Sequence, residues 1–124
     1  LLLEALKEYC FYLDRFPSMV VGDFNCYVGQ SGVRKSTGTF EDCIAEMECH
    51  GLRSLYHEQT NEKFGEEKTP TFFWQFNQEK PFFLDYAFCT MKPISFKIGD
   101  WEREISDHRP LIIELEEEPW DGRP

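Results

Sequence analysis

The sequence predicts an α/β fold in which helices cover a mixed, mainly antiparallel sheet. Apolar residues recur at helical spacing near the start of the chain, whereas later segments are short β-branched or aromatic runs. Of the 124 residues, 41% are hydrophobic, and twelve Phe, five Tyr and three Trp supply apolar surface for a core. Length and composition together predict one globular domain.

Helix signals dominate the first part of the chain. Apolar residues over 2–16 share one helical face, which predicts an amphipathic helix that ends before the proline at position 17. Residues 19–21 predict a short buried strand that the following glycine stops. The glycines and serines of 27–39 indicate a loop. A second helix is expected over 40–50, with Thr39 as its N-cap.

Strand signals dominate the second part. Five segments are expected to be extended: 52–56, 71–76, 82–89, part of 91–104, and 111–115. Polar residues 57–70 indicate a surface excursion, and the sequence NQEK at 77–80 indicates a hairpin connection. Residues 1–116 are expected to form the domain and 117–124 a flexible tail.

Charge and cysteine content narrow the function classes. The net charge of −10 provides no basic surface for general nucleic-acid binding, but it suits a protein that binds divalent cations. Five cysteines without a CxxC pair indicate reduced thiols in a cytoplasmic protein. No apolar run reaches the ~18 residues of a membrane span. A zinc cluster of Cys43, Cys49, His50 and His57 matches no common spacing and is disfavoured.

The first polar cluster with possible chemistry is Gly22-Asp23-Phe24-Asn25, directly after the first expected strand. A carboxylate and a carboxamide two residues apart point to the same side of an extended segment. Such a pair can bind a metal ion or a water molecule. An Asx-turn that caps the following loop explains the same residues, and the local sequence leaves both interpretations open.

Two further clusters contain Asp85 and His108. Asp85 lies inside the apolar run FFLDYAF, where an ionised carboxylate needs a cation or several hydrogen-bond donors. A salt bridge to Arg103 or Arg109 and the orientation of a histidine are equally good explanations. His108 directly precedes the closing strand, next to Asp107. The two other histidines are expected at the surface.

The three clusters together resemble the endonuclease/exonuclease/phosphatase superfamily, which has the deoxyribonuclease I-like fold. The segments VVGDFN, FLDYAF and SDHRPL match the motifs of its C-terminal half in type, order and approximate spacing, and TPTFFW matches a segment common before the second motif. The resemblance implies a four-layer α/β sandwich, of which this chain is half. It also implies a divalent-metal-dependent phosphoesterase.

The resemblance implies a role for each matching residue. Asp23 positions or deprotonates the attacking water, and Asn25 holds the phosphate or that water. Asp85 hydrogen-bonds His108, which contacts the phosphate and stabilises charge on its oxygens. Asp107 is a ligand of Mg²⁺ or Mn²⁺, ions that carboxylate and phosphate oxygens suit.

The resemblance also sets expectations about the rest of the molecule. Nothing here matches the N-terminal half of the family, so the chain is expected to be a fragment that is inactive alone and exposes a sheet face. That face would take the other half or a second copy. The substrate is a phosphate ester, with nucleic acid among the candidates; Phe73, Trp74 and Trp101 could stack on bases. The alternative is a non-enzymatic interaction module or pseudoenzyme fragment of the same fold.

Overall fold

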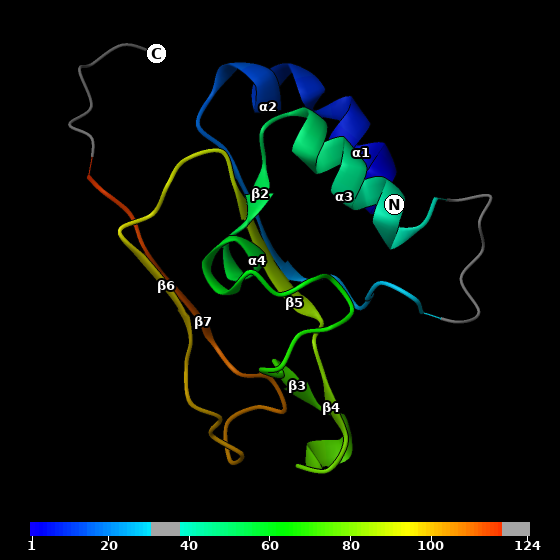
Figure 1. Cartoon of the computed structure of the whole chain (residues 1–124), viewed down its shortest axis with the longest axis vertical. Coiled ribbons are helices and arrows are strands. Elements are labelled where there is room, and N and C mark those ends of the chain that lie inside the picture. Colours follow the sequence, from blue (N-terminus) through cyan, green and yellow to red (C-terminus); the bar gives the residue numbers. More distant parts are fainter. Residues whose placement is uncertain (31–37, 118–124) are drawn as a thin grey trace.

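A computed structural model describes residues 1–30 and 38–117 of the chain (Figure 1). The helices are α1 (Leu2–Glu8), α2 (Cys10–Arg15), α3 (Phe40–Cys49) and α4 (Leu55–Thr60), with a 3-10 helix at Trp74–Phe76. The strands are β1 (Met19–Asp23), β2 (Arg53–Ser54), β3 (Phe72–Phe73), β4 (Pro81–Phe82), β5 (Asp85–Cys89), β6 (Ser95–Ile98) and β7 (Leu111–Glu114). The expected tail lies outside the described residues from position 118 onward.

The strands form three small antiparallel sheets. The first has the order β1-β5-β2, and the other two are the pairs β3-β4 and β6-β7. In Figure 1, α1, α2 and α3 lie together at one end of the molecule and the β3–β4 hairpin lies at the other. The structure is therefore a mixed α/β fold, but within the described residues the strands form separate antiparallel sheets and not one mixed sheet.

The first expected helix is interrupted. Tyr9 has φ −94° and ψ 10°, which ends α1 and starts α2. Only Leu6 of these two helices is buried, and Tyr9 and Phe16, which were predicted to share the apolar face, are each 56% exposed. The prediction for α3 is confirmed, because Thr39 and Asp42 form a reciprocal capping box at its start.

Several element boundaries differ from the prediction. The expected strand 71–76 is β3 followed by the 3-10 helix, and the expected strand 82–89 is divided into β4 and β5. Strand β1 continues through Gly22, which has φ 149°, a value that glycine adopts without strain, and so Asp23 is its last residue. The expected strand 52–56 is instead β2 followed by α4 from Leu55. The helix turns the chain back so that Leu55 and Tyr56 are buried against the core.

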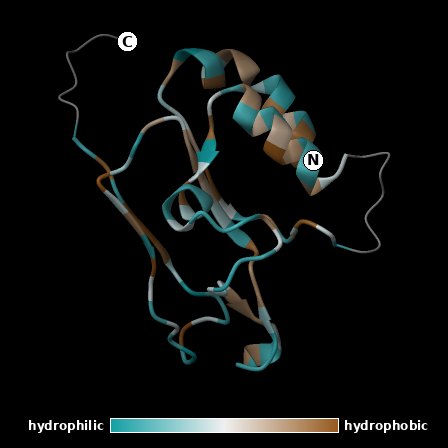
Figure 2. Ribbon diagram, viewed as in Figure 1, coloured by the Kyte–Doolittle hydropathy of each residue, from teal (hydrophilic) through white to brown (hydrophobic). Residues whose placement is uncertain are grey.

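Strand β5 is the centre of the core. All five of its residues are buried, although strand alternation had suggested two different faces. One side is covered by an aromatic cluster that includes Phe24, Phe40 and Phe64 around Tyr86. Hydrophobic residues line the central strands and parts of α1 and α3 (Figure 2).

The neighbouring strand β1 is less protected. Its residues alternate between half-buried and exposed, and Met19 and Val21 are 36% and 44% exposed. Because these two residues pair with Cys89 and Ala87, they lie on the same side of the sheet as Asp23 and Asp85. Within the described residues, no helix combines the length and the apolar character needed to cross a membrane.

Candidate functional site

The register of β1 and β5 places two carboxylates opposite each other. Asp23 is the last residue of β1, Asp85 is the first of β5, and the two are direct cross-strand partners. Residues opposite each other in an antiparallel pair project their side chains to the same face of the sheet. The carboxylate groups of two motifs that are 62 positions apart in the sequence therefore meet at one end of the sheet.

His108 completes this group, which we call the Asp-Asp-His cluster (Asp23, Asp85 and His108). Its Nδ1 lies 2.8 Å from Oδ2 of Asp85, and its Nε2 lies 3.5 Å from Oδ2 of Asp23. The imidazole is 26% exposed, so one side remains open to solvent. The ring thus bridges the two carboxylates, with a hydrogen bond to the buried one.

Arg103 and Arg109, the two other partners considered for Asp85, form hydrogen bonds with other groups. Arg103 donates from Nε to the carbonyl oxygen of Phe76, and Arg109 donates from Nε to the carbonyl oxygen of Gly99. Of the two explanations for Asp85 that the sequence left open, the contact with the histidine is the one present.

Burial raises the pKa of Asp85 above its ordinary value, and the nearby Asp23 carboxylate raises it further. Hydrogen bonds from His108 and Thr71 act in the opposite direction and favour the ionised form. The net shift is upward, since the side chain is 11% exposed and desolvation is the largest effect. The imidazole is therefore the main compensation for a desolvated carboxylate.

Asn25 supports the turn interpretation of its segment without removing Asp23 from the cluster. The backbone N–H of Asn25 donates to Oδ1 of Asp23 at 2.9 Å, and Asn25 has the left-handed φ of 52°. This is the Asx-turn that the sequence allowed. Because it uses Oδ1 while Oδ2 faces His108, the same carboxylate caps the loop and contributes to the cluster.

Asp107 is not one of the three residues whose ligand atoms come together. Among the described residues, the group of His, Cys, Asp or Glu side chains close enough to share a metal ion is the Asp-Asp-His cluster, whose ligand atoms lie within 4.8 Å of one another. Asp107 is half-buried, and its carbonyl oxygen accepts a hydrogen bond from the N–H of Phe73. Its predicted role as a metal ligand stays a prediction.

Thr71 is a residue of this site that the sequence did not identify. It is fully buried, and its hydroxyl oxygen accepts hydrogen bonds from the N–H groups of Leu84 and Asp85 at 2.9 and 3.2 Å. Its carbonyl oxygen accepts the N–H of Arg109 at 2.7 Å. One residue therefore ties the start of β5 to the segment that carries His108. Its sequence signal was its place in TPTFFW, the segment that resembles one common before the second motif, but no role was assigned to it.

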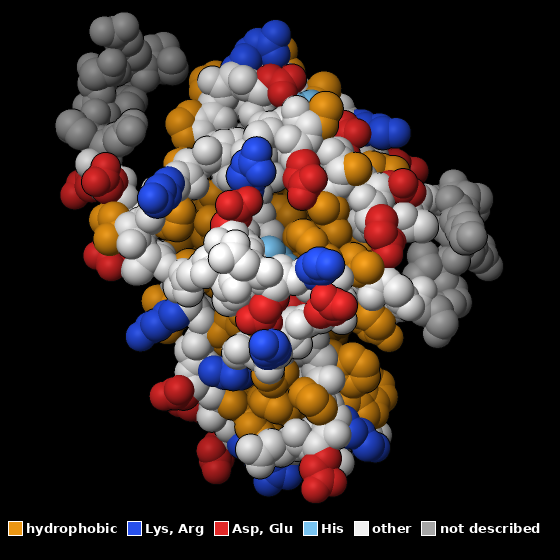
Figure 3. All heavy atoms as spheres, viewed as in Figure 1, with side chains coloured by type: hydrophobic (Ala, Val, Ile, Leu, Met, Phe, Trp, Pro, Cys, Tyr) orange, Lys and Arg blue, Asp and Glu red, His pale blue; other side chains and the backbone are white. Residues whose placement is uncertain are grey.

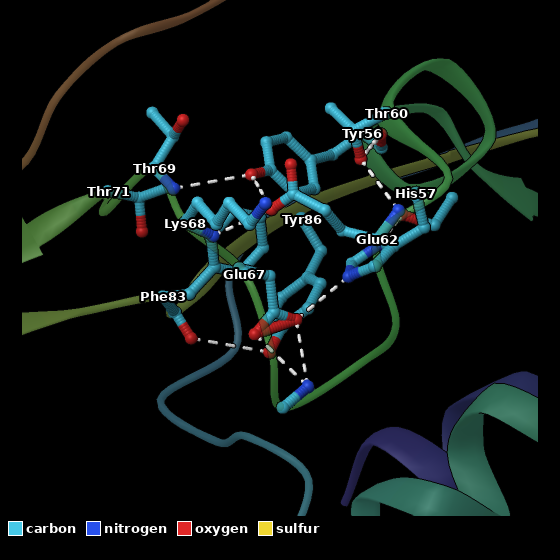
Figure 4. Close-up of polar contacts among 12 residues, drawn as sticks. Tyr56, His57, Thr60, Glu62, Glu67, Lys68, Thr69, Thr71, Phe83 and Tyr86 are labelled. Atoms are coloured by element: carbon cyan, nitrogen blue, oxygen red, sulfur yellow. Dashed lines mark hydrogen bonds and ion pairs between the residues drawn. The ribbon is translucent and has the colours of Figure 1, made fainter.

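A second polar cluster involves His57, which was wrongly expected at the surface. Its Nε2 lies 2.8 Å from Oε2 of Glu67 and its Nδ1 contacts Oγ of Ser54. The imidazole stacks on Phe64, with ring centroids 3.7 Å apart. Figure 4 shows Glu67 reaching from the loop after α4 to His57.

The burial of this second cluster identifies it as structural. The side chains of His57 and Glu67 are 7% and 4% exposed, so a substrate has no access to them. The same loop is held by Glu62, which accepts hydrogen bonds from the Tyr56 hydroxyl and the Lys68 N–H (Figure 4). These contacts close the loop that leads directly to Thr71.

The three aromatic residues considered for stacking separate into two groups. Phe73 is 6% exposed and packs on Trp101, with ring centroids 4.2 Å apart, and both rings therefore belong to the packing of the fold. Trp74 is 51% exposed. Of the three, Trp74 has a ring face free for a ligand.

Comparison of the chain with protein-family models, with curated proteins and with solved structures found no match. The geometry of the Asp-Asp-His cluster and the sequence motifs that build it are therefore the basis of the proposed function.

Proposed function

We propose that this chain carries part of the active site of a divalent-metal-dependent phosphoesterase related to the endonuclease/exonuclease/phosphatase superfamily. One observation supports this proposal above the others: the imidazole of His108, hydrogen-bonded to Asp85, faces the second carboxylate of Asp23 across a 3.5 Å gap. A histidine oriented by one carboxylate and facing another is suited to polarise a phosphoester and an attacking water.

In this proposal His108 is the group that contacts phosphate. The contact with Asp85 holds the ring so that Nε2 points toward Asp23 and the open side of the cluster. As an imidazolium, His108 donates a hydrogen bond to a phosphate oxygen and stabilises the charge that develops there. Asp85 does not touch the substrate and acts by orienting the ring.

Asp23 and Asn25 act on the water that attacks phosphorus. The Asp23 side chain is 36% exposed and its Oδ2 lies next to His108, so it can accept a water proton at the open side of the cluster. The Asx-turn presents Asn25 directly after it, and the exposed carboxamide is available to hold that water or a phosphate oxygen.

The open side of the cluster suits a divalent cation beside the phosphate. Because His108 is assigned to phosphate and Asp85 to the orientation of its ring, Asp23 is the residue of the cluster that would offer a carboxylate oxygen, a ligand that suits Mg²⁺ and Mn²⁺. We propose that Asp107, directly before His108, adds a further oxygen ligand. When bound, the ion acts as a Lewis acid that polarises the phosphoryl group.

The proposal extends to the fold. We propose that the described elements are the C-terminal half of a four-layer α/β sandwich, with the other half or a second copy against β1. The support is the exposure of Met19 and Val21 on the side of the sheet that bears the Asp-Asp-His cluster. Apolar side chains at a sheet face are normally covered.

The test is hydrolysis of p-nitrophenyl phosphate and bis(p-nitrophenyl) phosphate by the full-length protein, with Mg²⁺ and Mn²⁺ titrated separately. His108→Ala is expected to lower turnover about 10²- to 10⁴-fold, the usual loss for a group of this kind. EDTA is expected to abolish turnover, and added metal to restore it.

His50→Asn is the matched control, because it removes another half-buried imidazole that lies outside the cluster. Its turnover should stay within a factor of about two of wild type. The proposal is wrong if His108→Ala hydrolyses both esters at the wild-type rate, or if hydrolysis is unaffected by EDTA.

A further inference from the structure

The β3–β4 hairpin carries exposed aromatic side chains next to the Asp-Asp-His cluster. Trp74, Phe76 and Phe82 are 51%, 41% and 38% exposed. The space-filling view shows hydrophobic side chains gathered at the end of the molecule where this hairpin lies (Figure 3). Scattered apolar residues on a surface need no explanation, but a contiguous aromatic group next to a candidate site does.

Phe72 connects this group to the cluster. Its ring lies 4.6 Å from the ring of His108 and 6.4 Å from that of Trp74, measured between centroids. The ring of Phe82 lies 6.2 Å from Phe72 on another side. A continuous run of aromatic rings therefore extends from His108 to the exposed surface.

The backbone of the hairpin separates these rings from the core. Phe72 and Phe73 form β3 and point to opposite faces, so that Phe73 packs on Trp101 and Phe72 lies against His108. Trp74 begins the 3-10 helix that follows, and its ring lies against that of Phe72. Core packing explains Phe73 but not the exposure of Trp74.

The turn that follows Trp74 is held in an unfavourable conformation. Gln75 and Phe76 are consecutive non-glycine residues with φ values of 52° and 56°. Left-handed conformations at such residues cost free energy and persist when the surrounding contacts impose them. Here Trp74 and Lys80 close the turn through a backbone hydrogen bond of 3.0 Å, and Arg103 donates to the carbonyl oxygen of Phe76. These contacts hold the turn that begins at Trp74.

We infer that Trp74, Phe72 and Phe82 form a stacking platform for a planar ring carried by the phosphoester substrate. This inference rests on the proposed function, since it places the phosphate at His108 and the ring on the hairpin. Aromatic side chains beside a phosphate site bind rings through their faces, irrespective of the exact ring.

The charge of this chain disfavours a large polyanionic ligand on the hairpin. The chain has 23 acidic and 13 basic residues, so it repels a polyanion with many phosphates and offers it few counter-charges. A small phosphoester with one ring, of nucleotide size, keeps the stacking energy and avoids most of the repulsion. The inferred substrate class is therefore a ring-bearing small phosphoester and not a polynucleotide.

The experiment compares two ligands that differ only in the ring: AMP and ribose 5-phosphate. Dissociation constants are measured with Mg²⁺ by ligand-observed NMR, in which hydrolysis would appear in the same spectra. Trp74→Ala is expected to weaken AMP binding about 5- to 100-fold, the loss for one stacked base, and to leave ribose 5-phosphate unchanged. Trp74→Phe should recover most of the AMP affinity.

Phe11→Ala is the matched control. Phe11 is 52% exposed, as Trp74 is 51% exposed, but it lies on α2 at the opposite end of the molecule (Figure 1). It should change neither dissociation constant. Equal weakening of both ligands by Trp74→Ala, or no weakening of AMP binding, overturns the platform.

His108→Ala separates this inference from the proposed function. It should weaken both ligands, because both carry phosphate. If it weakens neither while Trp74→Ala still weakens AMP binding, the platform stands and the phosphate site at His108 is wrong. If wild-type protein binds neither ligand at millimolar concentration, both are wrong.

Discussion

Thr71→Val is expected to destabilise the protein and to release the orientation of His108. The substitution keeps the shape of the side chain and removes its hydroxyl group. In the structure that hydroxyl accepts the N–H groups of Leu84 and Asp85, and no solvent reaches it because Thr71 is 0% exposed. Valine leaves both donors without this acceptor.

The cost follows from these two contacts. A buried donor left without its partner costs roughly 1–3 kcal/mol, so two such donors predict a loss of about 2–4 kcal/mol once partial relaxation is allowed. Thr71→Ser keeps the hydroxyl and removes one methyl group, which predicts a loss of about 1 kcal/mol. Thr71→Val is therefore expected to lower the free energy of unfolding more than Thr71→Ser, although valine fills the site better.

Two measurements test this expectation. Urea unfolding followed by circular dichroism gives the difference in free energy between the two variants. ¹⁵N NMR of the histidine rings reports the tautomer of His108 at a pH where the imidazole is neutral. In wild type the proton is expected on Nδ1, which faces Asp85, and serine should keep this tautomer while valine mixes the two.

If Thr71→Val is as stable as Thr71→Ser, the Thr71 hydroxyl does not stabilise the fold as proposed. The prediction is also wrong in part if valine lowers stability but His108 keeps a single tautomer, because Thr71 would then support the fold without positioning the cluster.

Two other histidines give further predictions. His57→Ala should lower the free energy of unfolding by about 3–5 kcal/mol, because it leaves the buried carboxylate of Glu67 unpaired; a loss below about 1 kcal/mol in urea unfolding contradicts the buried pair. The imidazole of His50 donates hydrogen bonds to the carboxylates of Asp14 and Glu46, and these bonds hold the pKa of His50 above its ordinary value of 6.5. The stabilisation is complete below about pH 6.5 and is lost as pH rises through the folded-state pKa, so the urea midpoint of wild type should fall from about pH 6 to about pH 8 more than that of His50→Asn. Parallel pH curves for the two proteins contradict this assignment.

The sequence predicted those parts of the molecule that local patterns determine. The cap at Thr39, the hairpin at 77–80 and the start of the first strand at Met19 all follow from residues that are close in sequence. The meeting of Asp23, Asp85 and His108 was expected because their three motifs resemble those of one family, and the structure brings their ligand atoms together.

Contacts between residues that are far apart in the sequence could not be predicted from local sequence patterns. His57 stands in a polar stretch and was assigned to the surface, but Glu67 from the next loop pairs with it and makes its burial possible. Thr71 appeared to be an ordinary strand residue, because its partners are N–H groups 13 and 14 positions away. Both errors have one cause. Whether a buried polar side chain stabilises a core depends on its hydrogen-bond partners, and only the tertiary structure supplies these partners.

The Asp-Asp-His cluster is costly for the fold, and this cost supports the proposed function. Like charges directly opposite each other on neighbouring strands destabilise a sheet, and Asp23 and Asp85 are such a pair. Burial adds to the cost at Asp85, whose pKa is raised by desolvation. An apolar pair at these two positions would stabilise the sheet more, so packing does not account for the carboxylates. An imidazolium or a divalent cation between them offsets the repulsion, and the proposed phosphoesterase site would supply either.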